Sequence, residues 1–155
     1  MTSISAPGTS ISAPGDVRRG ERGKAACRGI FARSFPGERA QVRRVRAAIA
    51  PLLDGYPFAD DAVLIVSELA ANAAVHSRSA AAGGQFTARA EIYAGEYVWI
   101  GVEDQGGPWT QNGHDDGRPH GLDLVAALAG AGNWGIDGDA EHGRTVWARL
   151  NWPRC

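Results

Sequence analysis

Three polar side chains interrupt an otherwise apolar stretch of the sequence at equal intervals. Glu68, Asn72 and His76 each lie four residues from the next, so in a helix they form one stripe. Carboxylate and amide oxygens side by side are suited to a hard cation such as magnesium, or to a positioned water. The alternative is that the stripe is the solvent edge of an amphipathic helix.

A second polar group stands where an expected strand ends and a long loop begins. Glu103 and Asp104 are followed closely by the paired glycines Gly106 and Gly107. Paired glycines let a backbone approach a ligand closely, and an aspartate beside them can accept a hydrogen bond from an amino group. An ordinary turn is the alternative. The whole stretch 103–119 lacks periodicity, which is typical of a functional lid or of disorder.

Two further features lie toward the C-terminus. Residues 118–122 lead into an expected helix, and a helix N-terminus is a ready site for an anion. Residues 143–145, Gly-Arg-Thr, open the last expected strand. Each of these signals is weak when it is taken alone.

Hydrophobic periodicity predicts the elements that must position these residues. We expect a first strand near 30–35, a helix that begins near Pro36 and ends at 54–55, and a longer helix over 60–77. Two strands joined by a turn at 94–96 and a third helix near 122–128 follow, and the last two strands flank a turn at 137–139. This order predicts an α/β (α+β) two-layer sandwich, with a mixed, mainly antiparallel sheet and about three helices on one face.

Length and composition limit the classes of protein to consider. The chain has 155 residues, 44% hydrophobic and 21% charged, which is typical of one globular domain. Lysine plus arginine total 16 against 17 acidic residues, whereas nucleic-acid-binding proteins usually carry a basic excess. No apolar run approaches the roughly 20 residues of a membrane span, and Cys27 and Cys155 lack the spacing of metal ligands. We expect a cytoplasmic protein with no nucleic-acid or membrane partner.

The N-terminal residues differ in composition from the rest. The heptapeptide TSISAPG occurs twice in succession, and basic residues follow it. Sequence rich in Ser, Pro and Gly buries too little apolar surface to offset the entropy of ordering. We interpret 1–26 as a disordered tail and 27–155 as the folded domain. A docking arm for an acidic partner is the alternative for the basic part of the tail.

Four segments, in this order, resemble the motifs of the ATPase superfamily shared by gyrase, heat-shock chaperones, histidine kinases and mismatch-repair proteins. They are residues 64–76, 103–108, 120–125 and 143–147. The closest resemblance is to short actinobacterial proteins similar to anti-sigma-factor serine kinases, and it covers roughly 34–150. It implies the Bergerat-type ATP-binding fold, with ATP and magnesium as ligands.

The resemblance also implies roles for the residues that match its helix and phosphate motifs. Asn72 is expected to bind the magnesium that bridges the ATP phosphates. Glu68 is expected to be the general base that activates a substrate hydroxyl or a water. His120, Gly121 and Leu122 are expected to hold phosphate at the start of the third helix.

The remaining motifs imply a site for the base. Asp104 is expected to accept a hydrogen bond from the adenine amino group, and Thr145 to support adenine through its hydroxyl or a water. Gly106 and Gly107 are expected to let the loop close over the base. In the family the two glycines are separated by one residue, and a glycine stands where this chain has Pro119; proline lacks an amide donor and stiffens the lid.

Three functions follow from the resemblance as hypotheses. The first is an ATP-dependent serine/threonine kinase that phosphorylates an anti-sigma-antagonist protein, with a sigma factor as a further partner and a homodimer as a possible state. The second is a catalytically silent nucleotide-binding module that regulates by partner binding, as the changed glycines and Pro119 suggest. The third is the ATPase part of a split histidine kinase.

Overall fold

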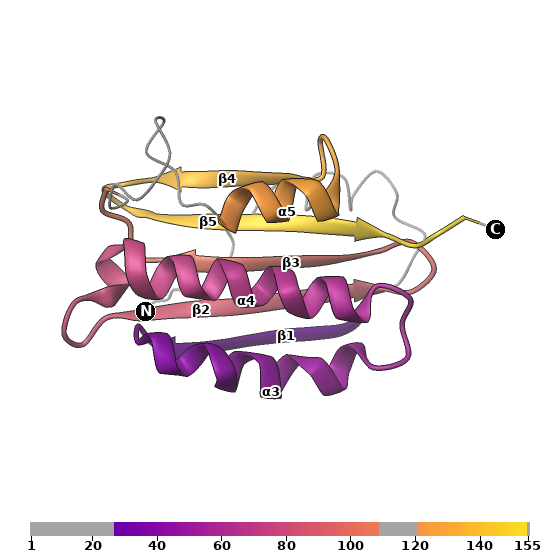
Figure 1. Cartoon of the computed structure of the whole chain (residues 1–155), viewed down its shortest axis with the longest axis horizontal. Helices are drawn as coiled ribbons and strands as arrows, with labels where there is room; N and C mark the ends of the chain where they lie inside the picture. Colours follow the sequence, from indigo (N-terminus) through magenta and orange to yellow (C-terminus); the bar gives the residue numbers. More distant parts are fainter. Residues whose placement is uncertain (1–26, 109–120, 155) are drawn as a thin grey trace, which may run out of the picture.

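The computed structural model describes residues 27–108 and 121–154. They form three α-helices, two short 3-10 helices and one five-stranded sheet. Figure 1 shows the helices lying side by side on one face of the sheet. The elements are, in chain order, β1 (Cys27–Pro36), η1 (Arg39–Gln41), α3 (Val42–Leu53), α4 (Ala59–His76), η2 (Arg78–Ala80), β2 (Gln85–Tyr93), β3 (Tyr97–Asp104), α5 (Gly121–Ala129), β4 (Trp134–Asp139) and β5 (Gly143–Asn151).

The sheet confirms the expected α+β class and the layout of helices on one face. Its strand order is β1-β2-β3-β5-β4, and every pairing between these strands is antiparallel. The expectation of a mixed sheet is therefore wrong for the part that the structure describes. Hairpins join β2 to β3 and β4 to β5, so each of these pairs closes locally and needs no crossover.

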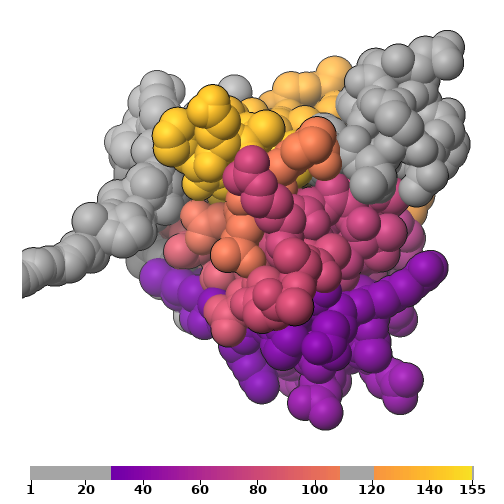
Figure 2. All heavy atoms as spheres, turned by 90° about the vertical axis from the view of Figure 1, so that its left-hand side faces the viewer, coloured from indigo at the N-terminus to yellow at the C-terminus, as the bar shows by residue number. Residues whose placement is uncertain are grey.

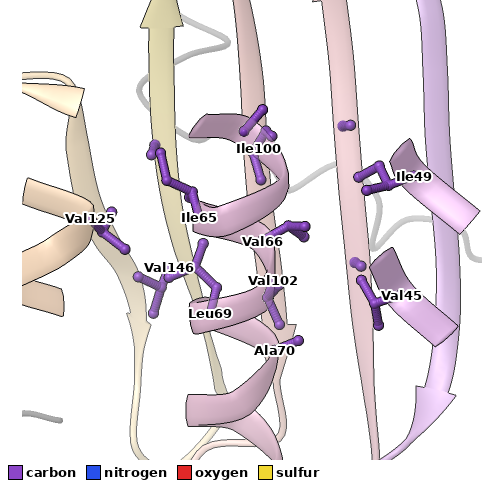
Figure 3. Close-up of a cluster of buried hydrophobic side chains, with 14 of the residues drawn as sticks. Val45, Ile49, Ile65, Val66, Leu69, Ala70, Ile100, Val102, Val125 and Val146 are labelled. Carbon is purple, nitrogen blue, oxygen red and sulfur yellow. The ribbon is translucent and has the colours of Figure 1, made fainter. Parts of the chain in front are cut away.

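Helix α4 is the central helix of the layer, and its apolar side forms the core with the sheet. Ile65, Val66 and Leu69 point toward the strands, where they meet Ile100 and Val146 (Figure 3). These side chains are at most 5% exposed, so their burial supplies much of the hydrophobic stabilisation. Within the described residues no helix is both long and apolar enough to cross a membrane.

Helix α3 follows the spacing that predicted it. Its apolar residues Val42, Val45, Ile49 and Leu53 are buried against α4 and the sheet, and its arginines are exposed. The helix ends at Asp54 and a left-handed glycine, Gly55, as expected. Pro36, however, is the last residue of β1 rather than the first of a helix.

The other face of the sheet carries a separate aromatic cluster, composed of Tyr93, Tyr97, Trp99 and Trp147. The strands alternate, so these residues lie on the opposite side from the core under the helices. Arg149 stacks on the ring of Tyr97, with the guanidinium carbon 5.1 Å from the ring centre.

The turn between the last two strands is three residues later than expected. Residues 137–139 belong to β4, and the turn is formed by 140–142. The Asp139 carboxylate accepts hydrogen bonds from the amides of Glu141 and His142, at 2.8 and 2.7 Å. An aspartate in this role commonly opens a turn. Gly138, which the sequence places in the turn, lies in β4 with a positive φ of 88°.

Candidate functional site

Glu68, Asn72 and Gly121 come together where the N-terminal end of α5 meets the C-terminal half of α4. A Cβ placed on Gly121 would lie 2.7 Å from Oε2 of Glu68 and 3.4 Å from both side-chain atoms of the Asn72 amide. Only a glycine therefore fits here while the two side chains keep their positions. A carboxylate, a side-chain amide and the N-terminal end of a helix thus converge on one point.

Asn72 occupies a buried position with unused hydrogen-bonding capacity. Its side chain is 8% exposed, and its Nδ2 atom has no hydrogen-bond partner among the described residues. The two ends of an amide are interchangeable by rotation about the last bond, so either the nitrogen or the oxygen can face a ligand. Buried amides usually find partners within the protein, and this one is available to a bound group.

His76 continues the stripe one helical turn further and differs from the other two residues. It is half-buried, and burial, followed by the positive charge of Arg39, lowers its pKa below the ordinary histidine value. Both effects favour the neutral imidazole. The solvent-edge interpretation of the stripe is wrong, because Asn72 is buried and Glu68 is half-buried.

A second cluster lies at the end of β3, around Asp104. Asp104 and Arg144 face each other in the register of β3 and β5, with Oδ1 3.5 Å from Nε. Oδ1 also accepts the Gly106 amide at 2.7 Å. Burial raises the pKa of the Asp104 carboxyl, and the Gly106 amide and the Arg144 guanidinium act in the opposite direction. The sequence analysis did not anticipate that Arg144 would share this carboxylate.

The segment after Asp104 is fastened on both sides. The Gln105 amide donates to Oγ of Ser79 at 3.0 Å, and the Gly106 carbonyl accepts the Arg78 amide at 2.8 Å. On the other side, the Gly107 amide donates to the Ala140 carbonyl at 2.6 Å. Figure 2 views this end of the molecule, where the orange end of β3 lies between the pink segment after α4 and the yellow start of β5.

Both glycines of this segment are required by the backbone. Gly106 and Gly107 have φ values of 84° and 85°, which other residues adopt only with strain. A Cβ on Gly106 would lie 2.5 Å from the Ala140 carbonyl oxygen, and one on Gly107 would lie 2.7 Å from Cγ of Arg78. The expected close approach of the backbone is therefore made to other parts of this chain.

Two expected site residues have other surroundings. Thr145 pairs with Glu103 on β3 and with Asp137 on β4. It therefore lies on the face of the sheet opposite to Asp104, and the structure does not bring the two together. Leu122 is fully buried in the core, so only its backbone amide remains for a ligand at the helix start.

Some expectations lie outside the described residues. These are His120, the part of the expected lid 103–119 that follows residue 108, including Pro119, and the tail 1–26. The residues that the sequence analysis missed are Arg144, Arg78 and Ser79. For Arg144 a signal existed, because it alternates in step with the apolar residues Val146 and Ala148, which face the helices.

The described residues contain no group of three or more His, Cys, Asp or Glu side chains able to hold a metal ion. A divalent cation at Asn72 would therefore depend on oxygens that a ligand brings with it. A site of one amide oxygen, one carboxylate and ligand oxygens suits magnesium, which is bound in proteins by few side chains together with phosphates.

The chain matches no known protein-family model and no curated protein sequence. The chemistry of the site is therefore argued from its own geometry. The first cluster places a carboxylate and a side-chain amide beside a helix start, and the second places a buried carboxylate beside a guanidinium. The second cluster is tied to η2, which directly follows the helix that carries the first.

Proposed function

We propose that this protein is an ATP-binding serine/threonine protein kinase similar to anti-sigma-factor kinases, built on a Bergerat-type fold. The motif order in the sequence and the α+β arrangement with helices on one face support this proposal. One observation carries it further than the resemblance. Gly121 at the start of α5 lies against both Glu68 and Asn72, so a phosphate bound at the helix start would touch the base and the amide.

In this proposal the residues of α4 carry the chemistry. The hydroxyl oxygen of the acceptor forms a bond to the γ-phosphorus of ATP, and the bond from that phosphorus to the β,γ-bridging oxygen breaks. The hydroxyl proton passes to the Glu68 carboxylate, and ADP leaves with the electron pair. The amides at Gly121 and beyond stabilise the charge of the phosphate.

Asn72 is the residue that would hold magnesium, through its amide oxygen. Its burial and its unpartnered amide nitrogen fit a side chain reserved for a ligand. When bound together with ATP, magnesium neutralises charge on the phosphates. Glu68 lies near enough to share this site, because both side chains approach Gly121.

The adenine end of the proposed site is built around Asp104. Its carboxylate would accept a hydrogen bond from the amino group of adenine, beside the contacts it makes with Arg144 and Gly106. The fastened glycine segment would then form a rigid edge beside the base. The proposed protein partners, an anti-sigma-antagonist and a sigma factor, and the role in transcription rest on the resemblance.

Calorimetric titration with ATP, with and without magnesium, tests binding in this proposal. We expect magnesium-dependent binding that Asp104→Asn weakens. Transfer of labelled γ-phosphate to a serine should disappear in Glu68→Ala, while ATP binding remains. Transfer that persists in Glu68→Ala would contradict the base assignment, and absence of binding at millimolar ATP would contradict the proposal as a whole.

A catalytically silent nucleotide-binding module is the second candidate. The observation that favours it is in the sequence: Gly106 and Gly107 are adjacent, and Pro119 stands before the phosphate motif, where proline supplies no amide to grip a phosphate. It predicts ATP binding and partner binding without any phosphorylated product. Phosphoserine on a partner incubated with the protein and ATP would exclude it.

A further inference from the structure

A groove runs between α3 and α4 on the outer side of the helix layer. The two helices pack against each other (Figure 1), and the groove has a volume of about 320 Å³. The side chains that matter for its chemistry are Arg39, Arg43, Arg46, Ser67, Glu68 and Ala71. Arginines form one wall, and the proposed catalytic base stands in the other.

The three arginines are free to meet a partner. All three are exposed, and within the described part of the chain none of their side chains forms a hydrogen bond or an ion pair. Arg43 and Arg46 lie three apart on α3 and therefore share a helix face. Along the chain no acidic residue occurs between 39 and 53, and among the residues that line the groove three are arginines and one, Glu68, is acidic.

Glu68 belongs to two places at once. On one side its Oε2 atom lies against Gly121 at the start of α5, and on the other its side chain lines the arginine groove. A general base must reach the acceptor hydroxyl while that hydroxyl is in line with the phosphate. The phosphate side is the α5 side, so the acceptor must arrive from the other.

We propose that this groove is the docking surface for an acidic segment of the acceptor protein, which presents its serine or threonine hydroxyl to Glu68. The inference rests on the proposed function and adds the route and the charge of the substrate. Carboxylates on either side of the acceptor residue would pair with Arg43 and Arg46, and Arg39 would extend the contact toward His76. The bonds made and broken are those given above for phosphoryl transfer to a hydroxyl.

Charge at this groove is expected to act on recognition rather than on the chemical step. Exposed arginine–carboxylate pairs each contribute modestly and are screened by salt, and several together give measurable selectivity. Reversing the charge of two arginines should therefore weaken the binding of an acidic peptide by about tenfold or more. ATP binding should be unaffected, because the arginines line the acceptor side.

The test uses the full chain and two labelled probe peptides. In one, glutamates flank a single serine, and in the other each glutamate is replaced by glutamine. Fluorescence anisotropy measures peptide binding, and calorimetry measures ATP binding. The variant is Arg43→Glu with Arg46→Glu. Arg44→Glu is the control for position, because Arg44 is exposed on the same helix but does not line the groove, and Arg43→Glu alone is compared with it at equal net charge.

We expect the glutamate peptide to bind the protein at least about tenfold more tightly than the glutamine peptide. This preference should vanish in the double variant and survive in Arg44→Glu, with melting temperatures unchanged in both. Equal losses in the variant and the control, or equal binding of the two peptides, would overturn the docking surface. Weaker ATP binding in the double variant would assign the arginines to phosphate and also overturn it.

The outcome for the groove can be separated from the outcome for the kinase. Phosphate transfer from labelled ATP to the two peptides is measured in parallel, with Glu68→Ala as the blank. Transfer to both peptides at equal rates would keep the kinase and overturn the acidic docking surface. Selective peptide binding without ATP binding or transfer would overturn the kinase and, with it, this assignment of the groove.

Discussion

Arg144 and Asp104 form a buried pair across β3 and β5, with Nε 3.5 Å from Oδ1 and both side chains less than 10% exposed. The same guanidinium also donates from Nη2 to the Gly106 carbonyl at 3.3 Å. One arginine therefore fixes both the carboxylate and the glycine segment that follows it. Because Asp104 is also the proposed contact for adenine, this pair connects the stability of the fold to the proposed adenine site.

Replacing Arg144 by methionine should destabilise the protein strongly. The substitution leaves the Asp104 carboxylate buried without its cation, and breaking such a pair costs about 3 kcal/mol. Urea unfolding followed by tryptophan fluorescence measures this loss. Asp104→Asn combined with Arg144→Met should recover most of it, because asparagine can still accept the Gly106 amide. If the double variant lost as much unfolding free energy as the two single variants lose in sum, this account would be contradicted.

Asp104 should also give a defined pH dependence to stability. Burial raises the pKa of this carboxyl above 3.8 in the folded state, so the folded protein holds the proton more tightly than the unfolded chain. Its contribution to the free energy of unfolding is therefore greatest below pH 3.8 and falls as pH rises through the raised pKa. Unfolding of the protein and of Asp104→Asn across this range should show their difference shrinking with rising pH. A difference that grows would mean that the pKa is lowered.

The order and type of the elements could be predicted because each element carries its own pattern. Apolar residues at helical spacing, such as Val45 and Ile49, lie on one face of a helix, and that face must pack against the core. The turn before β5 was misplaced because Gly138 looks like a turn residue, although here it occupies the strand with a positive φ. The position of the turn is fixed by Asp139, whose carboxylate accepts hydrogen bonds from two backbone amides of the turn.

The candidate site was predicted only in part, for a similar physical reason. Glu68 and Asn72 share one helix, so their spacing alone places them together. The pairing of Asp104 with Arg144 depends on the register between two strands that are distant in sequence. The motif predicts a site role for Thr145 and none for Arg144, whereas strand alternation puts Arg144 on the side of Asp104 and Thr145 on the other.

Substitutions at glycines should separate backbone strain from steric clash. Gly95→Ala introduces a side chain at a φ of 82° with no atom within 4 Å, so it should cost about 1 kcal/mol from the backbone alone. Gly106→Ala adds a contact of 2.5 Å with the Ala140 carbonyl oxygen. We expect it to lose about 2 kcal/mol more in urea unfolding, because backbone must shift. Equal losses at the two positions would show that the segment yields easily.

Asn72→Leu should improve stability and remove function. Leucine has nearly the shape of asparagine, and it would replace a buried amide nitrogen that has no partner among the described residues. We expect a gain of about 1 kcal/mol in urea unfolding. Magnesium-dependent ATP binding should disappear in calorimetry, while any residual binding should be the same with EDTA. A loss of stability would mean that the amide is satisfied by a contact that leucine cannot make.

Gly121→Ala should damage phosphate transfer while leaving the fold intact. The added methyl would meet the end of the flexible Glu68 side chain at 2.7 Å, so Glu68 can move aside at a cost of less than about 1 kcal/mol. Displacing a catalytic group by about 1 Å can reduce a rate by about 100-fold, and a reduction of this size is expected in single-turnover transfer from labelled ATP. Gly29→Ala is the control, because its methyl would make only an ordinary contact of 3.7 Å with Ile92. If Gly121→Ala transferred phosphate at the full rate, Glu68 would not be the base beside the reacting phosphate. Loss of transfer in both variants would point to a general effect on the fold.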